Sequence, residues 1–353
     1  MCSHTDSPSP AQRFFDDARS SFERAAAQAG SSEWQLGVAG HVIRMRFAGD
    51  ALVPLITPAL EHLRVRTTRE EPAFTVELFD TESTGVRMVP APWAPDAYGP
   101  KGEIVGYNDE CSRTVYQPGV DILQLFDAAR ATAVYWTPSY RYIPWWESSF
   151  PLRTAIHWWT TTTPSLQPMH AGAVGRDDGG VLIAGRGGTG KSTTSLACLD
   201  GGLLYAGDDY VLVDVDQPTV YSLYNTAKLR PENLHRFPHL ERLVTNADSL
   251  SEQKAMLFLQ HHRPEQLRAG FPVRAILLPR VTGRPRTQTS PATARDALAA
   301  IAPTTMFQLP GASPELFEKV GRLTRAVPCF WLDAGTELSE IPVAVDDLIA
   351  KLR

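Results

Sequence analysis

Residues 185–192 have the types and spacing of a loop that binds the phosphates of a nucleotide. They read Gly-Arg-Gly-Gly-Thr-Gly-Lys-Ser, which fits the pattern G-x4-G-K-[ST]. Glycines let the backbone turn tightly and aim its N–H groups at an anion, and the N-terminus of a following helix adds partial positive charge. In such a loop Lys191 reaches the β and γ phosphates, and the Ser192 hydroxyl ligates Mg²⁺. The candidate nucleotide-binding residues are Gly185, Arg186, Gly187, Gly188, Thr189, Gly190, Lys191, Ser192 and Thr193.

The residues on either side of the loop predict the strand and the helix that it needs. An apolar run at 181–184 precedes the loop, and residues 191–200 have the pattern of a short helix. The same glycines also fit G-x-G-x-x-G, the pattern of a dinucleotide site, with the acid Asp208 about twenty residues on. Lys191 and Ser192 have no role in a dinucleotide turn, and the acid is one of a pair. Too few strand–helix repeats follow for a second mononucleotide half, so we favour a nucleoside triphosphate.

A pair of carboxylates ends the next apolar run. Residues 203–209 predict a strand that finishes in Asp208 and Asp209, directly after the predicted phosphate-loop helix. An Asp-Asp pair is often a solvated turn, but this position favours metal binding or base catalysis. His170 opens a predicted hairpin of two short strands, 171–174 and 181–184. On the residues alone, this histidine fits a site residue and a structural histidine equally well.

Composition describes a globular protein of two domains. The chain has 353 residues, 43% hydrophobic and 21% charged, with a net charge of −5, which disfavours a nucleic-acid scaffold. The four cysteines are scattered and lack metal or disulfide spacing, which fits a reducing compartment. The first residues do not resemble a signal peptide, and no apolar run is long enough to span a bilayer. We expect a cytoplasmic protein that binds neither nucleic acid nor a membrane.

The first half of the chain predicts an α+β domain without a catalytic motif. Residues 14–28 have the pattern of an amphipathic helix, and 41–47 and 73–79 alternate as half-buried strands. Residues 121–135 predict a helix followed by a strand. Five of the eight tryptophans lie between residues 135 and 159, and we interpret this segment as a linker and a helix whose aromatic side chains pack between two domains.

Two features of the second half bear on the substrate and on the sheet. Between residues 263 and 286 there are six arginines against one acid, and one or two of these arginines could clamp a phosphate or an acidic substrate. Residues 273–278 and 327–332 predict buried strands, and 341–352 predict a closing helix.

Taken together, these residues resemble the HPr kinase/phosphorylase family, and more closely the HPr-kinase-like serine kinases found with peptide natural-product genes. The resemblance is strong over residues 168–215, looser to 353 and faint before 150. It is carried, in chain order, by His170, Gly185, Lys191, Ser192, Gly202, Asp208 and Asp209.

The resemblance implies ATP, Mg²⁺ and phosphoryl transfer to a serine hydroxyl. It implies that Asp209 accepts the proton, that Asp208 organises the metal together with Ser192, and that His170 orients the phosphate or the base. The chain departs from the bacterial enzymes in two places. Thr193 stands where they carry Glu, and their glycine-rich signature with an acid is missing where Lys228 and Glu232 lie, so HPr itself is not the expected substrate. The candidate catalytic residues are Asp209, Asp208, His170, Lys191 and Lys228.

We therefore expect an α/β kinase domain of the phosphoenolpyruvate-carboxykinase-like phosphate-loop type at residues 151–353. A smaller α+β domain at 1–150 precedes it, with disordered first residues and a possible part in substrate recognition. The expected function is transfer of the γ-phosphoryl group of ATP to a hydroxyl, most simply a serine of a peptide or protein. A small-molecule alcohol kinase and a non-catalytic ATP-binding module that regulates a partner stay open, as does a homo-oligomer.

Overall fold

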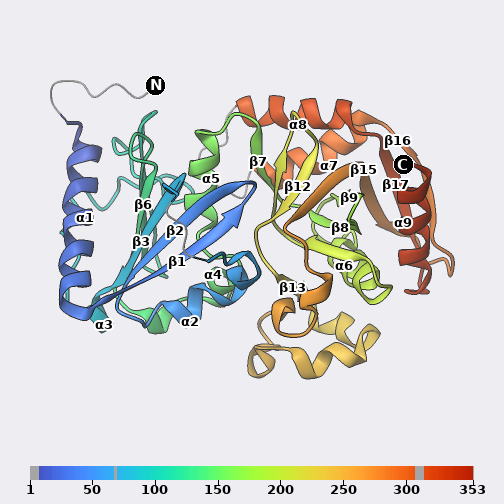
Figure 1. Ribbon diagram of the computed structural model, residues 1–353, viewed down its shortest axis with the longest axis horizontal. Coiled ribbons are helices and arrows are strands. Elements are labelled where there is room, and N and C mark those ends of the chain that lie inside the picture. The colour runs from blue at the N-terminus through green and yellow to red at the C-terminus, as the bar shows by residue number, and fades with distance from the viewer. Residues whose placement is uncertain (1–7, 67–69, 307–313, 353) are drawn as a thin grey trace. The chain divides into compact units, whose positions relative to one another are not determined.

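The computed structural model describes residues 8–66, 70–306 and 314–352, which form two compact units. The first unit holds the described residues up to Pro58 and from Arg64 to Pro164. The second unit holds Ala59–Leu63 and the described residues from Ser165 onward. Each unit is mixed α and β (Figure 1).

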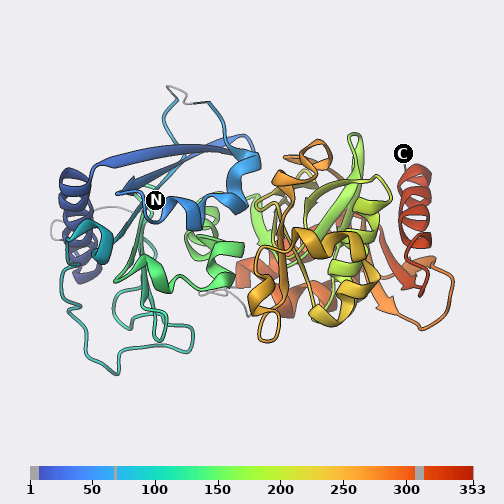
Figure 2. The same cartoon turned by 90° about the horizontal axis from the view of Figure 1, so that it is seen from below.

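The first unit is one sheet with a long helix against it. The strand order is β1-β2-β3-β6-β5-β4, in which β2 is parallel to β3 and β3 is parallel to β6. Helix α1 buries Phe14, Phe15 and Phe22 against the sheet, and Ser9 caps its N-terminus. A long connection between α3 and β4 leaves the strands as an extended loop (Figure 2). The elements are α1 (Pro10–Ala29), β1 (Ser31–Val38), β2 (His41–Ala48), α2 (Val53–Ile56), β3 (Phe74–Asp80), α3 (Thr81–Thr84), β4 (Ser112–Gln117), β5 (Ile122–Asp127), β6 (Thr132–Thr137), η2 (Tyr140–Tyr142), α4 (Trp145–Ser149) and α5 (Arg153–Thr161).

One sequence-based prediction for this unit is wrong. Residues 121–135 form the antiparallel strands β5 and β6 instead of a helix and a strand. Every residue of β5 is buried, so its apolar residues do not alternate with polar ones. A short run that is apolar on both faces has the same pattern in a buried strand as in a buried helix. The helix predicted at 14–28 and the strands predicted at 41–47 and 73–79 are confirmed as α1, β2 and β3.

The chain divides later than the predicted boundary at residue 150. Helix α5 stays with the first unit, because Trp159 stacks on Phe74 at 5.9 Å and Trp158 stacks on Phe126 at 6.2 Å between ring centroids. These tryptophans are part of the core of the first unit, whereas the sequence suggested packing between domains. The main segment of the second unit then begins at Ser165.

The second unit is a sheet covered by helices on both faces. Its strand order is β10-β8-β9-β15-β12-β11-β7, and β17 pairs with β15 and β16. Side chains alternate across β9, so Val181 and Ile183 pack with α6 and α9, whereas Leu182 packs with α7 and α8. The elements of the sheet and its helices are β7 (Leu166–Met169), β8 (Gly172–Arg176), β9 (Gly179–Ile183), α6 (Lys191–Asp200), β10 (Leu204–Gly207), β11 (Val211–Asp214), β12 (Thr219–Ser222), β15 (Gly270–Val281), β16 (Gln288–Ala292), α7 (Ala294–Met306), α8 (Pro314–Ala326), β17 (Cys329–Ala334) and α9 (Glu340–Lys351).

A separate two-stranded ribbon, β13 (Thr226–Leu229) and β14 (Ala255–Phe258), belongs to the same unit. Short 3-10 helices join the remaining parts, namely η1 (Pro58–Leu63), η3 (Pro231–Arg236), η4 (Pro238–Leu243), η5 (Ala247–Ser249), η6 (Leu259–His261) and η7 (Pro264–Gln266). Among the described residues, no helix is both long enough and apolar enough to cross a membrane. Cys198 and Cys329 are free and buried, whereas Cys111 takes part in a disulfide that the cysteine spacing does not predict.

A buried histidine fixes residues 59–63 to the second unit. His62 Nε2 lies 2.6 Å from Ser222 Oγ, its Nδ1 lies 3.4 Å from Asn225 Nδ2, and the Asn225 N–H donates to the Ala59 carbonyl at 2.9 Å. Since Asn225 donates to Nδ1, the neutral ring carries its proton on Nε2 and donates it to Ser222. Burial lowers the pKa of His62 from 6.5 to about 3.

This histidine makes the stability of the second unit depend on pH. The unfolded chain takes up a proton at His62 below a pH of about 6.5, and the folded chain does not until about 3. The free energy of unfolding should therefore fall by about 1.4 kcal/mol for each pH unit between these values. We expect the variant His62→Gln, which cannot titrate, to lose this part of the slope in urea unfolding between pH 7 and 5. Equal slopes for the two proteins would contradict the assignment.

Candidate functional site

The predicted phosphate loop lies between β9 and α6, where the sequence places it. Gly188 and Gly190 have φ of +85° and +103°, in the left-handed region that glycine adopts without strain. Gly190 is the N-cap of α6, so the N-terminus of this helix opens directly onto the loop. Lys191 is buried, and its amine donates to the Gly185 carbonyl at 2.7 Å. The backbone and the lysine together form a compact cationic turn suited to phosphate oxygens.

The aspartate pair follows β10 and is buried next to this loop. Asp208 is 2% exposed and Asp209 is 9% exposed. The Lys228 N–H donates to Asp208 Oδ2 at 3.3 Å, and the nearby Ser192 hydroxyl lowers the pKa of Asp208. The pair therefore lies buried beside the phosphate loop and is not a solvated turn.

Two side chains from distant parts of the chain hold Asp209. His170 Nε2 lies 2.9 Å from Oδ1, and the Lys228 amine lies 2.8 Å from Oδ2. The backbone N–H of His170 donates to Thr305 Oγ1 at 3.3 Å, which fixes the histidine at the end of β7. Each carboxylate oxygen retains a second lone pair that can accept a hydrogen bond from a substrate hydroxyl. The five candidate catalytic residues are thus brought together.

Burial and neighbouring charges separate the protonation behaviour of the two aspartates. Burial and the charge of Asp209 raise the pKa of Asp208. Burial alone would raise the pKa of Asp209 too, but the hydrogen bond from His170 and the charge of Lys228 hold it well below its usual value. Burial lowers the pKa of Lys191 and of Lys228, and the aspartates oppose both shifts. Such opposite shifts in one buried cluster are typical of functional sites.

The residues of this cluster fit a magnesium ion that shares its coordination with phosphates and water. Asp208 Oδ1 is buried and has no hydrogen-bond partner among the described residues. This oxygen and the Ser192 hydroxyl are hard ligands of the kind that Mg²⁺ prefers. Neither here nor elsewhere in the described residues do three or more His, Cys, Asp or Glu side chains come together as a metal site made of protein ligands alone. Such a protein cage is not needed for Mg²⁺, which keeps waters and substrate oxygens as ligands.

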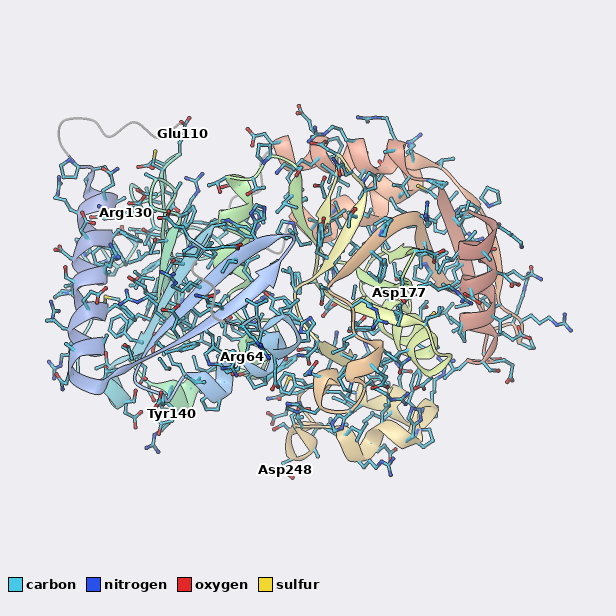
Figure 3. The ribbon with its side chains drawn as sticks, in the orientation of Figure 1. Arg64, Glu110, Arg130, Tyr140, Asp177 and Asp248 are labelled. Carbon is cyan, nitrogen blue, oxygen red and sulfur yellow. The ribbon has the colours of Figure 1, made fainter. Side chains whose placement is uncertain are left out.

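The arginines at 263–286 do not gather at this cluster. Arg268 pairs with Asp177 at 2.6 Å, Arg263 with Asp200 at 3.5 Å, and Arg280 with Asp333 (Asp177 is labelled in Figure 3). Arg274 donates to the Asp178 carbonyl at 2.9 Å. Arg284 and Arg286 line a separate cavity of about 250 Å³, to which no residue of the aspartate cluster contributes. Four of the six arginines therefore have partners outside the aspartate cluster, and these four do not form the predicted clamp.

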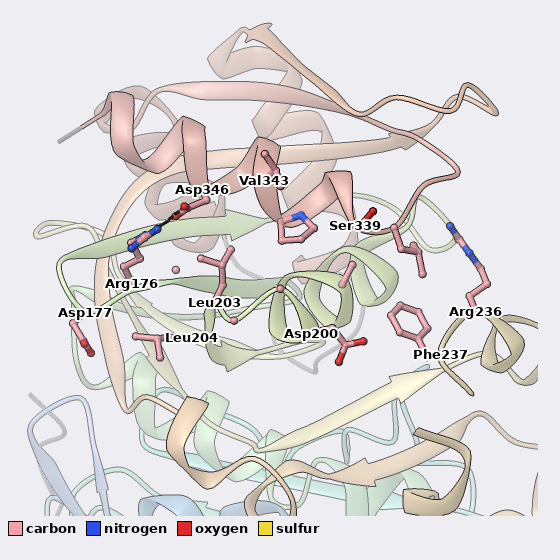
Figure 4. A pocket seen from close by; sticks show the side chains of 16 residues that line it. Arg176, Asp177, Asp200, Leu203, Leu204, Arg236, Phe237, Ser339, Val343 and Asp346 are labelled. Carbon is pink, nitrogen blue, oxygen red and sulfur yellow. Dashed lines mark hydrogen bonds and ion pairs between the residues drawn. The ribbon is translucent and has the colours of Figure 1, made fainter. Parts of the chain in front are cut away.

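A cavity of about 650 Å³ lies at the far end of α6. Gly201, Gly202 and Leu203 line it together with the first turn of α9, and the ion pair between Arg176 and Asp346 lies at one side of it (Figure 4). Its first lining residue on α6, Ala197, comes six residues after Lys191, about 9 Å along the helix, and no residue of the phosphate loop or the aspartate pair lines it. This cavity is consequently not the place where the phosphate loop and Asp209 would meet a substrate.

Two further cations that belong to no sequence motif, Arg230 and Lys254, lie beside β13 and β14. Arg230 comes two residues after Lys228 at the end of β13, and this spacing was the one signal that could have drawn attention to it. Lys254 comes directly before β14 and carries no motif of its own.

No protein-family model and no curated protein matches the sequence. Among solved structures, the chain is similar to the HPr(Ser) kinase/phosphatase from Coxiella burnetii, at 15% sequence identity and a TM-score of 0.29. The match covers 52% of this chain and 95% of the other.

Proposed function

We propose that the second unit is an ATP-dependent kinase that transfers the γ-phosphoryl group to a hydroxyl. The observation that carries the proposal is the convergence, in one buried cluster, of the phosphate loop, the Ser192–Asp208 pair and Asp209 held by His170 and Lys228. A phosphate site alone would not need a carboxylate that is both buried and fixed by two partners. Phosphoryl transfer does need one, because a hydroxyl must be positioned in line with the phosphorus atom.

Each residue then has a defined part in the transfer. The loop N–H groups and Lys191 bind the phosphates, and Ser192 and Asp208 would hold Mg²⁺, which neutralises charge on the phosphate oxygens. Asp209 accepts a hydrogen bond from the attacking hydroxyl and takes its proton. The bond from the hydroxyl oxygen to phosphorus forms, the bond from phosphorus to the bridging oxygen breaks, and ADP leaves. His170 and Lys228 keep the carboxylate in place.

We further propose that the acceptor is a serine of a peptide or protein. Support comes from the resemblance to serine kinases associated with peptide products and from the first unit, in which the sequence holds no catalytic motif. Binding energy from groups remote from the reacting atoms can position a poor nucleophile. The arginine run no longer supports this choice, because acids and backbone carbonyls elsewhere engage four of its members.

Nucleotide binding is tested by thermal unfolding with Mg-ATP and with NAD. At about 100 times its dissociation constant, a ligand should raise the free energy of unfolding by about 2.7 kcal/mol. We expect this shift with Mg-ATP and not with NAD. The variant Lys191→Ala should lose it, whereas Lys351→Ala, at the exposed end of α9, should keep it. Stabilisation by NAD alone, or an unchanged shift in Lys191→Ala, would overturn the proposal.

Transfer is tested with labelled ATP on the full chain, with serine-containing peptides compared against small alcohols. Phosphoserine on a peptide supports the proposed acceptor. Turnover of small alcohols with none of any peptide would make the protein a small-molecule kinase. If the protein binds ATP without transferring phosphate to either class of acceptor, and Asp209→Asn does not change ATP binding, the protein is a regulatory nucleotide-binding module.

A further inference from the structure

The ribbon of β13 and β14 ends in two cations on the face that carries Lys228. Its antiparallel register pairs Lys228 with Met256 and Leu229 with Ala255, so Arg230 and Lys254 are the next residues on the two chains. Arg230 is still extended, with φ of −65° and ψ of 138°. Alternate residues of an extended chain share a face, and residues directly opposite each other do so too. Arg230 and Lys254 therefore lie on the side of the ribbon from which Lys228 reaches Asp209.

Contacts with the phosphate loop agree with this placement. A Cβ atom built on Gly188 would lie 4.0 Å from a terminal guanidinium nitrogen of Arg230, so this arginine lies over the loop. Lys254 is close enough that its charge lowers the pKa of both Lys191 and Lys228, behind the larger effect of burial. The two cations thus border the space between the loop and the aspartate pair.

This arrangement gathers positive charge that a bound anion would neutralise. Like charges on directly opposite strand positions repel each other, and Lys191 and Lys228 add two more positive charges nearby. Glu232 pairs with Arg230 at 3.5 Å, but both side chains are exposed, so this pair contributes little. A phosphate group placed over Gly188 would meet the guanidinium of Arg230 in addition to the loop N–H groups, and Lys254 adds positive charge on the same face of the ribbon.

We propose that Arg230 and Lys254 form a clamp that binds the terminal phosphate of the nucleotide and makes the site prefer a triphosphate over a diphosphate. The proposal rests on the function proposed above and names residues that function did not require. Lys191 and the loop hold phosphates from one side, and the clamp holds the last one from the ribbon. During transfer the clamp stabilises the negative charge that spreads over the oxygens of the phosphoryl group.

The test compares the affinities of Mg-ATP and Mg-ADP by calorimetry in the wild type, Arg230→Ala, Lys254→Ala and the double variant. A hydrogen bond to a charged group corresponds to about a 10- to 100-fold change in affinity. We expect each single variant to weaken ATP binding by about 10-fold or more and to change ADP binding by less than about 3-fold. Arg230→Lys, which keeps the charge, should recover part of the ATP affinity. Arg322→Ala, which breaks an exposed pair with Asp216 on the same unit, is the matched control and should change neither affinity.

The outcomes separate the clamp from the function on which it rests. Wild-type protein that binds neither nucleotide would overturn the proposed function, and the clamp with it. If the wild type binds ATP and transfers phosphate, but the variants have the same ratio of ATP to ADP affinity as the wild type, the clamp alone is overturned. Equal weakening of both nucleotides would also overturn it, because a general electrostatic effect does not single out the terminal phosphate.

Discussion

Replacing Asp209 by Asn should slow phosphoryl transfer by about 10²- to 10⁴-fold and leave the affinity for Mg-ATP unchanged. The amide keeps the size and one oxygen of the carboxylate but cannot take the proton of the attacking hydroxyl. Both oxygens of Asp209 already hold partners, His170 at 2.9 Å and Lys228 at 2.8 Å, so the carboxylate is fixed before a substrate arrives. Its low pKa makes it a weak base, which suffices where the transition state is loose and the proton leaves late.

Single-turnover transfer and nucleotide binding measured on the same preparations check this expectation. The loss of the carboxylate leaves the buried Lys228 without its ion-pair partner, and this can lower stability. The double variant Asp209→Asn, Lys228→Met removes both charges and should restore stability without restoring transfer. Asp216→Asn, at an exposed ion pair, is the control for loss of an acid elsewhere. Transfer by Asp209→Asn at the wild-type rate would show that this residue is not the proton acceptor.

The parts of the site that sequence could predict are those set by local spacing. The loop with Lys191 and Ser192, and the aspartate pair that follows β10, lie within 25 consecutive residues, 185–209, and their geometry follows from one strand–loop–helix–strand unit. His170 and Lys228 reach Asp209 from 39 residues before it and 19 after it. Spacing alone could not reveal that both would contact the same carboxylate.

The arginines show the opposite case, in which a strong local signal in the sequence is explained by partners from distant parts of the chain. The excess of arginine at 263–286 is visible only along the chain, because the neutralising acids Asp177, Asp200 and Asp333 come from other elements. Charge balance is set by contacts in three dimensions. Conversely, the register between β13 and β14 places Arg230 opposite Lys254 across 24 residues, and neither residue is part of a motif.

The domain boundary shows why a cut at residue 150 would damage the protein. Residues 59–63 precede that cut, yet His62 and Ala59 bond to Ser222 and Asn225 of the second unit. Asn225 is directly followed by β13, the strand that carries Lys228. A deletion of the first 150 residues would therefore remove the partners of buried polar groups beside the site, which is destabilising. Questions about the acceptor are better asked of the full chain.

Replacing Asp208 by Asn should weaken Mg²⁺ binding without lowering the stability of the free protein. Asp208 is buried, and its Oδ1 has no hydrogen-bond partner among the described residues. Without a metal, the buried carboxylate therefore lowers the free energy of unfolding. Without nucleotide and Mg²⁺, we expect the Asn variant to be at least as stable as the wild type, because it carries no buried charge. With Mg-ATP, the Mg²⁺ concentration that gives half-maximal transfer should rise by about 10-fold or more, since a neutral amide is a weaker ligand than a carboxylate.

Two titrations decide whether Asp208 has this role. Transfer measured against Mg²⁺ concentration should shift for Asp208→Asn and stay in place for Asp209→Asn, so the two neighbours give opposite results. Urea unfolding without ligands supplies the stability comparison. If Asp208→Asn lost stability and kept the wild-type Mg²⁺ requirement, Asp208 would be a structural residue held by Ser192 and the Lys228 N–H. A residue that lowers stability in the free protein and binds the metal in the complex with Mg-ATP is retained for function and not for folding.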